Sequence, residues 1–197
     1  HTLLLMCIVA LFMAEMFCYV AAFPKYQASQ VMAAVFSFLY APVLLSFVYL
    51  TRECENGIYL VWLILISSWG CDTCAYVVGK LIGKKHIFPE LSPHKSLEGC
   101  IGGVAGAALI GGLYAHFFVE AAFPDQIITW TIAFICAAGA VMSMVGDLAA
   151  SAIKRNHNIK DYGKLIPGHG GIMDRFDSMT VTAPMTYFLA ILMIGLR

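Results

Sequence analysis

The sequence has little charge. Lysine, arginine, aspartate and glutamate make up 12% of its 197 residues, against about 25% in typical soluble domains. Cations and anions are equal in number, so no nucleic acid partner is expected. The sequence also begins with His1 inside an apolar run, without an initiator methionine or a basic leading segment. We therefore expect a chain whose N-terminal helices are missing rather than a signal peptide.

Cysteine is present but forms no recognisable framework. The seven cysteines are scattered, mostly through apolar segments, where they act as small hydrophobic side chains. Cys71 and Cys74 have the spacing of half a zinc or redox motif, and no second pair accompanies them. We expect neither a disulfide framework nor a zinc site.

Long apolar runs make up most of the sequence. The chain is 60% hydrophobic, with a mean hydropathy of +0.80. Because a helix needs about 20 apolar residues to cross a bilayer, we predict an all-α, polytopic integral membrane protein with about six transmembrane helices. They are expected at residues 2–22, 29–50, 58–79, 100–119, 127–148 and 179–196. Glu15 in the first run is either a functional group or a hydrogen-bonded group that faces other helices.

Charge placement predicts the orientation. Ten of the twelve cations fall in the segments 23–28, 80–99 and 150–178, which alternate spans place on one side of the membrane. The positive-inside rule makes that side cytoplasmic. We therefore divide the chain into N-terminal transmembrane helices, 1–56, and a catalytic transmembrane domain, 57–197, whose loops 80–99 and 150–178 face the cytoplasm.

Glycine is concentrated at the start of the fourth apolar run, from Gly99 to Gly106. Small residues let helices approach closely in lipid, so this stretch indicates a packing seam more than a phosphate-binding loop. The seam is expected either inside the chain or between the two copies of a homodimer.

One polar segment, Gly146 to Ser178, interrupts the apolar sequence. Asp147, Ser151 and Lys154 follow one another on a single helical face, and Asp174 and Asp177 share a face of the next helix. Carboxylates that converge near a membrane surface repel one another unless a cation lies between them, and hard oxygen ligands suit Mg²⁺. The alternative is that these acids form surface ion pairs with the neighbouring lysine and arginines.

The same segment is rich in cations and glycine. Its lysines and arginines suit phosphate groups, although a basic loop that contacts anionic lipid headgroups has the same composition. Pro167 to Gly171 can form a tight turn whose N–H groups face an anion at a helix start. His169 in that turn could act as an acid or base, a ligand or a turn residue.

These residues resemble a known family. The runs Ser151-x-Ile153-Lys154-Arg155, Lys160-Asp161-x-Gly163 and Ile166-Pro167-Gly168-His169-Gly170-Gly171-Ile172-Met173-Asp174-Arg175-Phe176-Asp177 are similar to the signature of phosphatidate cytidylyltransferases (CDP-diacylglycerol synthases). Two upstream segments, Asp72–Lys80 and Ser92–Gly99, resemble the family as well.

The resemblance implies a reaction and its parts. A lipid phosphate attacks the α-phosphate of CTP and pyrophosphate leaves, so CTP and phosphatidic acid are the expected substrates and Mg²⁺ the expected cofactor, with a second cation such as K⁺. The implied location is a bacterial inner membrane. The implied roles are catalytic for Asp147, Lys154, Arg155, His169, Asp174 and Asp177; metal-binding for Asp147, Ser151 and Asp174; and substrate-binding for Asp72, Lys95, Ser96, Lys160, Lys164, Gly170, Gly171 and Arg175.

One position departs from the family pattern. Ala150 stands before Ser151, where the resemblance leads us to expect glutamate, which leaves an altered cation site or an inactive variant open. The alternative functions are a CTP-dependent enzyme on another lipid (a polyprenol kinase or an archaeal-lipid cytidylyltransferase), a CDP-alcohol phosphotransferase, whose aspartate-rich helix motif the sequence lacks, and a transporter. A transporter would place its polar groups at mid-membrane, whereas these acids cluster at helix ends.

Overall fold

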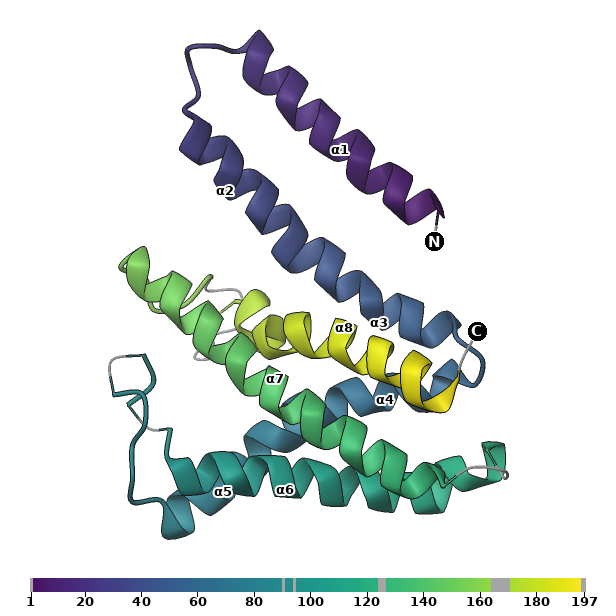
Figure 1. The fold of residues 1–197 in the computed structure, drawn as a ribbon. Helices are drawn as coiled ribbons and strands as arrows, with labels where there is room; N and C mark the ends of the chain where they lie inside the picture. Colours follow the sequence, from purple (N-terminus) through teal and green to yellow (C-terminus); the bar gives the residue numbers. More distant parts are fainter. Residues whose placement is uncertain (1, 90, 94, 124–126, 164–170, 196–197) are drawn as a thin grey trace. The chain divides into compact units, whose positions relative to one another are not determined.

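A computed structural model describes residues 2–89, 91–93, 95–123, 127–163 and 171–195. Within these residues all regular structure is helical, and the only strand-like pairing is a single antiparallel bridge between His86 and Ser96. Figure 1 shows the helices in chain order. The prediction of an all-α chain is confirmed.

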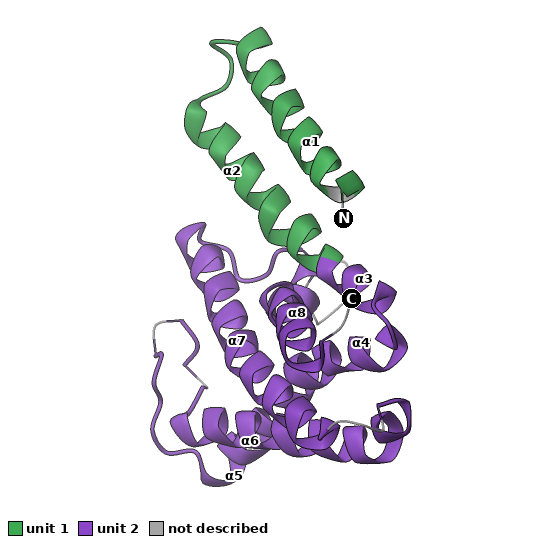
Figure 2. Ribbon diagram, turned by 45° about the vertical axis from the view of Figure 1, so that its right-hand side comes forward, with its two compact units in different colours: residues 1–46 green, residues 47–197 purple. Residues whose placement is uncertain are grey.

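The chain divides into two compact units, residues 1–46 and 47–197 (Figure 2). The first contains α1 (Thr2–Ala21), α2 (Ala28–Phe38) and a π-helical turn, Leu39–Val43, and α3 (Leu44–Glu53) begins at its end. Glu15, the acid predicted in the first span, lines a cavity of about 310 Å³ with Tyr19, Tyr26 and Gln30 in this unit.

The second unit holds the polar segments. Its helices are α4 (Gly57–Leu65), α5 (Cys71–Ile82), α6 (Leu97–Tyr114), α7 (Ile128–Asn156) and α8 (Met173–Ile194). π-helical turns, Ile66–Gly70 and Ala115–Val119, join α4 to α5 and continue α6, and a short 3-10 turn, Glu120–Ala122, follows. The functional division predicted at residue 57 stays a prediction.

Five helices of the described residues are long and apolar enough to cross a membrane: Ala28–Glu53, Gly57–Ile82, Leu97–Ala122, Ile128–Asn156 and Met173–Ile194. Five of the six predicted spans fall on these helices. The remaining one coincides with α1, whose apolar stretch Leu5–Ala21 is shorter. The chain is therefore built as a polytopic membrane protein.

Unit 2 is a bundle in which sequential helices pack on one another. α5 packs along α6, α6 along α7 and α7 along α8, while α4 contacts α7 and α8 (Figure 1). Large apolar residues fill one end, where Leu63, Ile132, Ile135 and Ile194 belong to a buried cluster. Smaller residues such as Cys71, Ala107 and Ala140 form a second cluster, nearer the polar loops.

The glycine-rich start of α6 is an internal seam. A Cβ atom on Gly102 would lie 2.6 Å from the side chain of Val78, and one on Gly106 would meet Cys74, so α5 approaches α6 at glycine. The predicted packing seam is confirmed, and it lies between helices of the same chain. The first turn of α5, which carries Asp72, also contacts α7, because the Cys71 thiol donates a hydrogen bond to the carbonyl of Ala140 at 3.8 Å.

Candidate active site

Four carboxylates from three helices line one cavity of unit 2. Asp72 lies in the first turn of α5, Asp147 in the second half of α7, and Asp174 and Asp177 at the start of α8. The cavity has a volume of about 360 Å³, and Trp69, Thr73, Arg175 and Ser178 complete its lining. The expectation that Asp174 and Asp177 share a face at a helix start is confirmed, because α8 begins at Met173.

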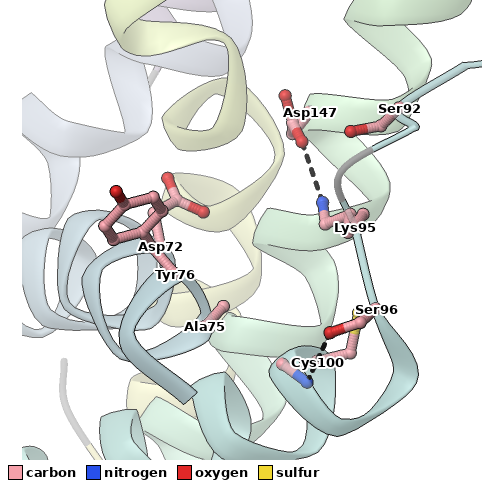
Figure 3. A pocket seen from close by; sticks show the side chains of 9 residues that line it. Asp72, Ala75, Tyr76, Ser92, Lys95, Ser96, Cys100 and Asp147 are labelled. Atoms are coloured by element: carbon pink, nitrogen blue, oxygen red, sulfur yellow. Dashed lines mark hydrogen bonds and ion pairs between the residues drawn. The ribbon is translucent and has the colours of Figure 1, made fainter. Parts of the chain in front are cut away.

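A second cavity shares a wall with the first. It measures about 280 Å³ and is lined by Asp72 and Asp147 together with Lys95, Ser92 and Ser96. Small and apolar groups make up the rest of the lining, namely Ala75, Tyr76, Gly99 and Cys100 (Figure 3). Asp72 and Asp147 therefore stand between a carboxylate-rich cavity and a less polar one.

Lys95 forms an ion pair with Asp147 across the second cavity. Nζ lies 2.8 Å from Oδ2, and the lysine side chain is only 13% exposed (Figure 3). The loop that carries Lys95 is anchored on both sides, because His86 pairs with Ser96 and the Ser96 hydroxyl caps α6 by accepting a hydrogen bond from the N–H of Gly99 at 3.2 Å. The local fold thus presents the Lys95 ammonium to α7.

Lys154 forms the second ionic centre. Its Nζ lies 2.9 Å from Oδ1 of Asp174 and 3.8 Å from Oδ2 of Asp177, and its side chain is 12% exposed. Poorly solvated charges of opposite sign hold one another strongly, because each would otherwise lose hydration without compensation. The structure therefore shows ion pairs at Lys154, as the alternative expected, but these pairs are largely buried rather than at the surface.

The two acids of α8 differ in how their oxygens are occupied. Oδ2 of Asp174 accepts hydrogen bonds from the backbone N–H groups of Tyr162 at 2.8 Å and of Gly171 at 3.0 Å, while Oδ1 binds Lys154. Asp177 accepts a bond from the N–H of Ser178 at 2.8 Å. Asp174 therefore also holds the segment before α8 in place through these hydrogen bonds. The sequence did not indicate this structural role.

Several predicted residues lie at the margin of these cavities. Ser151 is half-buried, one turn beyond Asp147, and is not among the residues that line them, whereas Arg155 and Lys160 are exposed. Arg175 lines the carboxylate cavity, and its carbonyl accepts a hydrogen bond from the indole N–H of Trp69 at 3.2 Å. Three further predicted residues, Lys164, His169 and Gly170, lie outside the described residues.

Two aromatic residues of the site were not predicted from the sequence. Trp69 lines the carboxylate cavity three positions before Asp72, so the helical spacing could have suggested it. Tyr162 carries no such signal, since its contacts depend on a loop that folds back onto α7 and α8. Ala150, the departure from the family pattern, is fully buried, and its carbonyl accepts a hydrogen bond from the Tyr162 hydroxyl at 3.2 Å.

A magnesium ion needs oxygen ligands, and carboxylates of the acidic cavity can supply some of them. Within the described residues, no three Asp, Glu, His or Cys side chains are grouped closely enough to hold a metal ion by themselves. Mg²⁺ is usually held by one or two carboxylates, with waters and substrate phosphates as its other ligands. Asp72 and Asp147, which line both cavities, offer such oxygens. They therefore fit a magnesium ion that binds together with a phosphate group.

These features define the class: an all-helical, polytopic membrane protein with an acidic cavity, two partly buried lysines and a less polar cavity beside it. The chain belongs to the cytidylyltransferase family, whose model matches residues 1–193.

Curated relatives give the likeness in more detail. The chain is 38% identical over 139 residues to the phosphatidate cytidylyltransferase of Haemophilus influenzae, which covers 70% of this chain and 48% of the relative. It is 36% identical over 135 residues to that of Bacillus subtilis, covering 68% and 48%. For the Thermotoga maritima protein the identity is 37% over 165 residues, covering 82% and 61%. The chain thus aligns with about half the length of these relatives.

Proposed function

We propose that this chain carries the active site of a CTP:phosphatidate cytidylyltransferase, which makes CDP-diacylglycerol and pyrophosphate. A phosphate oxygen of phosphatidic acid forms a bond to the α-phosphorus of CTP, and the bond from that phosphorus to the β-phosphate oxygen breaks. The proposal rests on one observation: Asp72 and Asp147 line both of two adjoining cavities, which differ in polarity. Two adjoining cavities of this kind suit a reaction between a highly charged substrate and a lipid.

The carboxylate-rich cavity is proposed to receive the triphosphate. Four acids line it, so an anionic nucleotide would be repelled unless cations accompanied it. We propose Mg²⁺, held by Asp147 with Asp72 or Asp177, and a second cation such as K⁺. Of the other two expected metal ligands, Ser151 does not line the cavity, and the oxygens of Asp174 are already bound by Lys154 and by two backbone N–H groups. When bound, the metal would neutralise phosphate oxygens and stabilise the charge of the leaving pyrophosphate. Arg175, which also lines this cavity, would supply a further cation for the same phosphates.

The second cavity is proposed to receive the lipid phosphate. Lys95 and two serines are its phosphate-binding groups, and Ala75, Tyr76 and Cys100 provide an apolar lining next to them. The Lys95 ammonium can exchange its contact with Asp147 for a phosphate oxygen, because both lie at the same cavity. That exchange would bring the lipid phosphate beside the carboxylate that faces the nucleotide.

The setting of the reaction belongs to the same proposal. The basic segments 80–99 and 150–178 support a cytoplasmic position for both cavities, where nucleotides are available. A bacterial inner membrane and a homodimer complete the proposal.

Radiolabel transfer tests the function. The chain, purified in detergent and shown to be helical by circular dichroism, is given α-labelled CTP and phosphatidic acid with Mg²⁺ or with EDTA. We expect a labelled CDP-lipid only with Mg²⁺. Asp177→Asn should lower the rate about 100-fold or more, because a charge facing the phosphates is lost. The matched control is Glu55→Gln, an exposed carboxylate in the turn between α3 and α4.

Two results would contradict the proposal. One is a folded chain that makes no labelled lipid in Mg²⁺, and the other is equal activity in Mg²⁺ and EDTA. Labelled product from a polyprenyl phosphate but not from phosphatidic acid would support the alternative lipid substrate instead.

A further inference from the structure

Tyr162 connects the two helices that carry the Lys154 ion pairs. Its hydroxyl donates a hydrogen bond to the carbonyl of Ala150 in α7 at 3.2 Å, and its backbone N–H donates to Oδ2 of Asp174 in α8 at 2.8 Å. One half-buried residue of the segment between the helices therefore binds both of them.

The ring of Tyr162 also lies beside the lysine itself. The Lys154 Nζ atom is 5.3 Å from the ring centroid, within the range of a cation–π contact. The same ammonium lies 2.9 Å from Asp174 and 3.8 Å from Asp177. Lys154 is thus bounded by two carboxylates and an aromatic face, which together restrict where its long, flexible side chain can point.

The chemical state of the tyrosine is compatible with this role. Burial raises the pKa of Tyr162 above its ordinary value, and the negative charges of Asp177 and Asp174 raise it further. The hydroxyl therefore keeps its proton at neutral pH and remains a donor to the Ala150 carbonyl.

We propose that Tyr162 is a positioning residue whose ring holds the Lys154 ammonium against Asp174 and Asp177. Its hydroxyl and backbone N–H fix the ring in place, and the ring closes the remaining side of the lysine. The catalytic consequence rests on the proposed function, since it assumes that Lys154 acts on the phosphates. The placement of Lys154 does not depend on that function.

Two substitutions separate the ring from the hydroxyl. Tyr162→Phe keeps the aromatic face and removes the hydrogen bond to Ala150, whereas Tyr162→Leu removes both but retains an apolar side chain. Both keep the backbone N–H that binds Asp174. The matched control is Tyr26→Leu in unit 1, which removes a similar contact, because the Lys25 Nζ atom lies 5.5 Å from the Tyr26 ring.

Competitive acetylation of lysines measures how well the Lys154 ammonium is shielded, without any enzymatic assay. Each variant is labelled at one pH, and peptide mass spectrometry gives the labelling rate of Lys154 relative to Lys95, which is shielded to a similar degree. We expect the ratio to rise about fivefold in Tyr162→Leu, because the ammonium loses its aromatic cover. It should change less than about twofold in Tyr162→Phe and in the Tyr26 control, where the ring over Lys154 is retained.

An unchanged ratio in Tyr162→Leu would overturn the proposal. An equal rise in the Phe and Leu variants would overturn it too, because the hydroxyl rather than the ring would then hold the lysine.

Kinetics then test the consequence for catalysis. We expect kcat for CDP-lipid formation to fall about fivefold in Tyr162→Leu, with the KM for CTP nearly unchanged. Tyr162→Phe should keep most of the kcat of the unaltered chain. A rise in KM alone would contradict a role in positioning Lys154 during the reaction. If the unaltered chain formed no CDP-lipid, the proposed function would fail, and the acetylation ratios would still decide the role of Tyr162.

Discussion

The ammonium of Lys95 lies 2.8 Å from Oδ2 of Asp147, although 52 positions separate the two residues in the chain. The contact joins the loop before α6 to the second half of α7. It also places a cation at the boundary between the acidic cavity and the less polar one, since Asp147 lines both. The pair therefore joins the predicted polar loop 80–99 to α7, the helix that leads into the second polar loop.

The first prediction concerns this ion pair. Lys95→Gln should raise the KM for phosphatidic acid about tenfold, because the cation that we propose binds the lipid phosphate is lost. The exposed Lys84 of the same loop is the control, and Lys84→Gln should leave the KM within about twofold. Steady-state kinetics at several phosphatidate concentrations measure both. An equal change in the two variants would mean that only the total charge of the loop matters.

A double-mutant cycle extends this prediction. Lys95→Gln combined with Asp147→Asn should cost less than the sum of the two single changes, since each single change also leaves its partner without a counter-charge. Strict additivity would show that the two side chains act independently in the working enzyme.

The second prediction compares two adjacent cations of α7. Lys154 is 12% exposed and lies between two acids, whereas Arg155 is exposed. Lys154→Gln should lower the free energy of unfolding by about 3 kcal/mol, because two poorly solvated carboxylates lose their counter-ion. Arg155→Gln should change it by about 0.5 kcal/mol or less.

Thermal unfolding in detergent, followed by circular dichroism, measures this difference. Equal shifts in the unfolding temperature of the two variants would contradict a structural role for the Lys154 ion pairs.

The third prediction tests the glycine seam between α5 and α6. A Cβ atom on Gly102 would lie 2.6 Å from Val78, whereas one on Gly112 of the same helix would lie 3.6 Å from Ala133, an ordinary contact. Gly102→Ala should therefore destabilise the bundle by about 1–3 kcal/mol through overpacking. Gly112→Ala should be neutral or slightly stabilising, because alanine favours helix more than glycine does.

The same thermal measurement separates the two glycine variants. If Gly102→Ala matched Gly112→Ala, the close approach of α5 and α6 at this position would be contradicted.

Much of the fold could be predicted from the sequence because lipid leaves few choices. A chain that crosses a bilayer must satisfy its backbone internally, so a long apolar run becomes a helix with little dependence on its neighbours. The run 58–79 corresponds to the helical segment Gly57–Ile82, and the start of α8 placed Asp174 and Asp177 on one face as expected. The packing role of Gly102 followed from its small size in the same way.

The site could be predicted only in part. Asp72, Lys95, Asp147 and Arg175 were all expected to contribute, and the structure brings them to two adjoining cavities. The pairing of Lys95 with Asp147 was not expected, because it depends on how a loop and a distant helix pack. The hydrogen bonds that Asp174 accepts from Tyr162 and Gly171 come from backbone N–H groups, which leave no mark in a sequence pattern.

What the sequence by itself determined is therefore local: apolar runs that must become membrane helices, and polar residues gathered at their ends. What the tertiary structure decided is which of those charges meet. Hydropathy acts on each segment independently, whereas an ion pair such as Lys154 with Asp174 needs side chains of two helices brought within about 3 Å of each other. Only the packing of α5, α6, α7 and α8 sets those distances, and through them the division of the site into an acidic cavity and a less polar one.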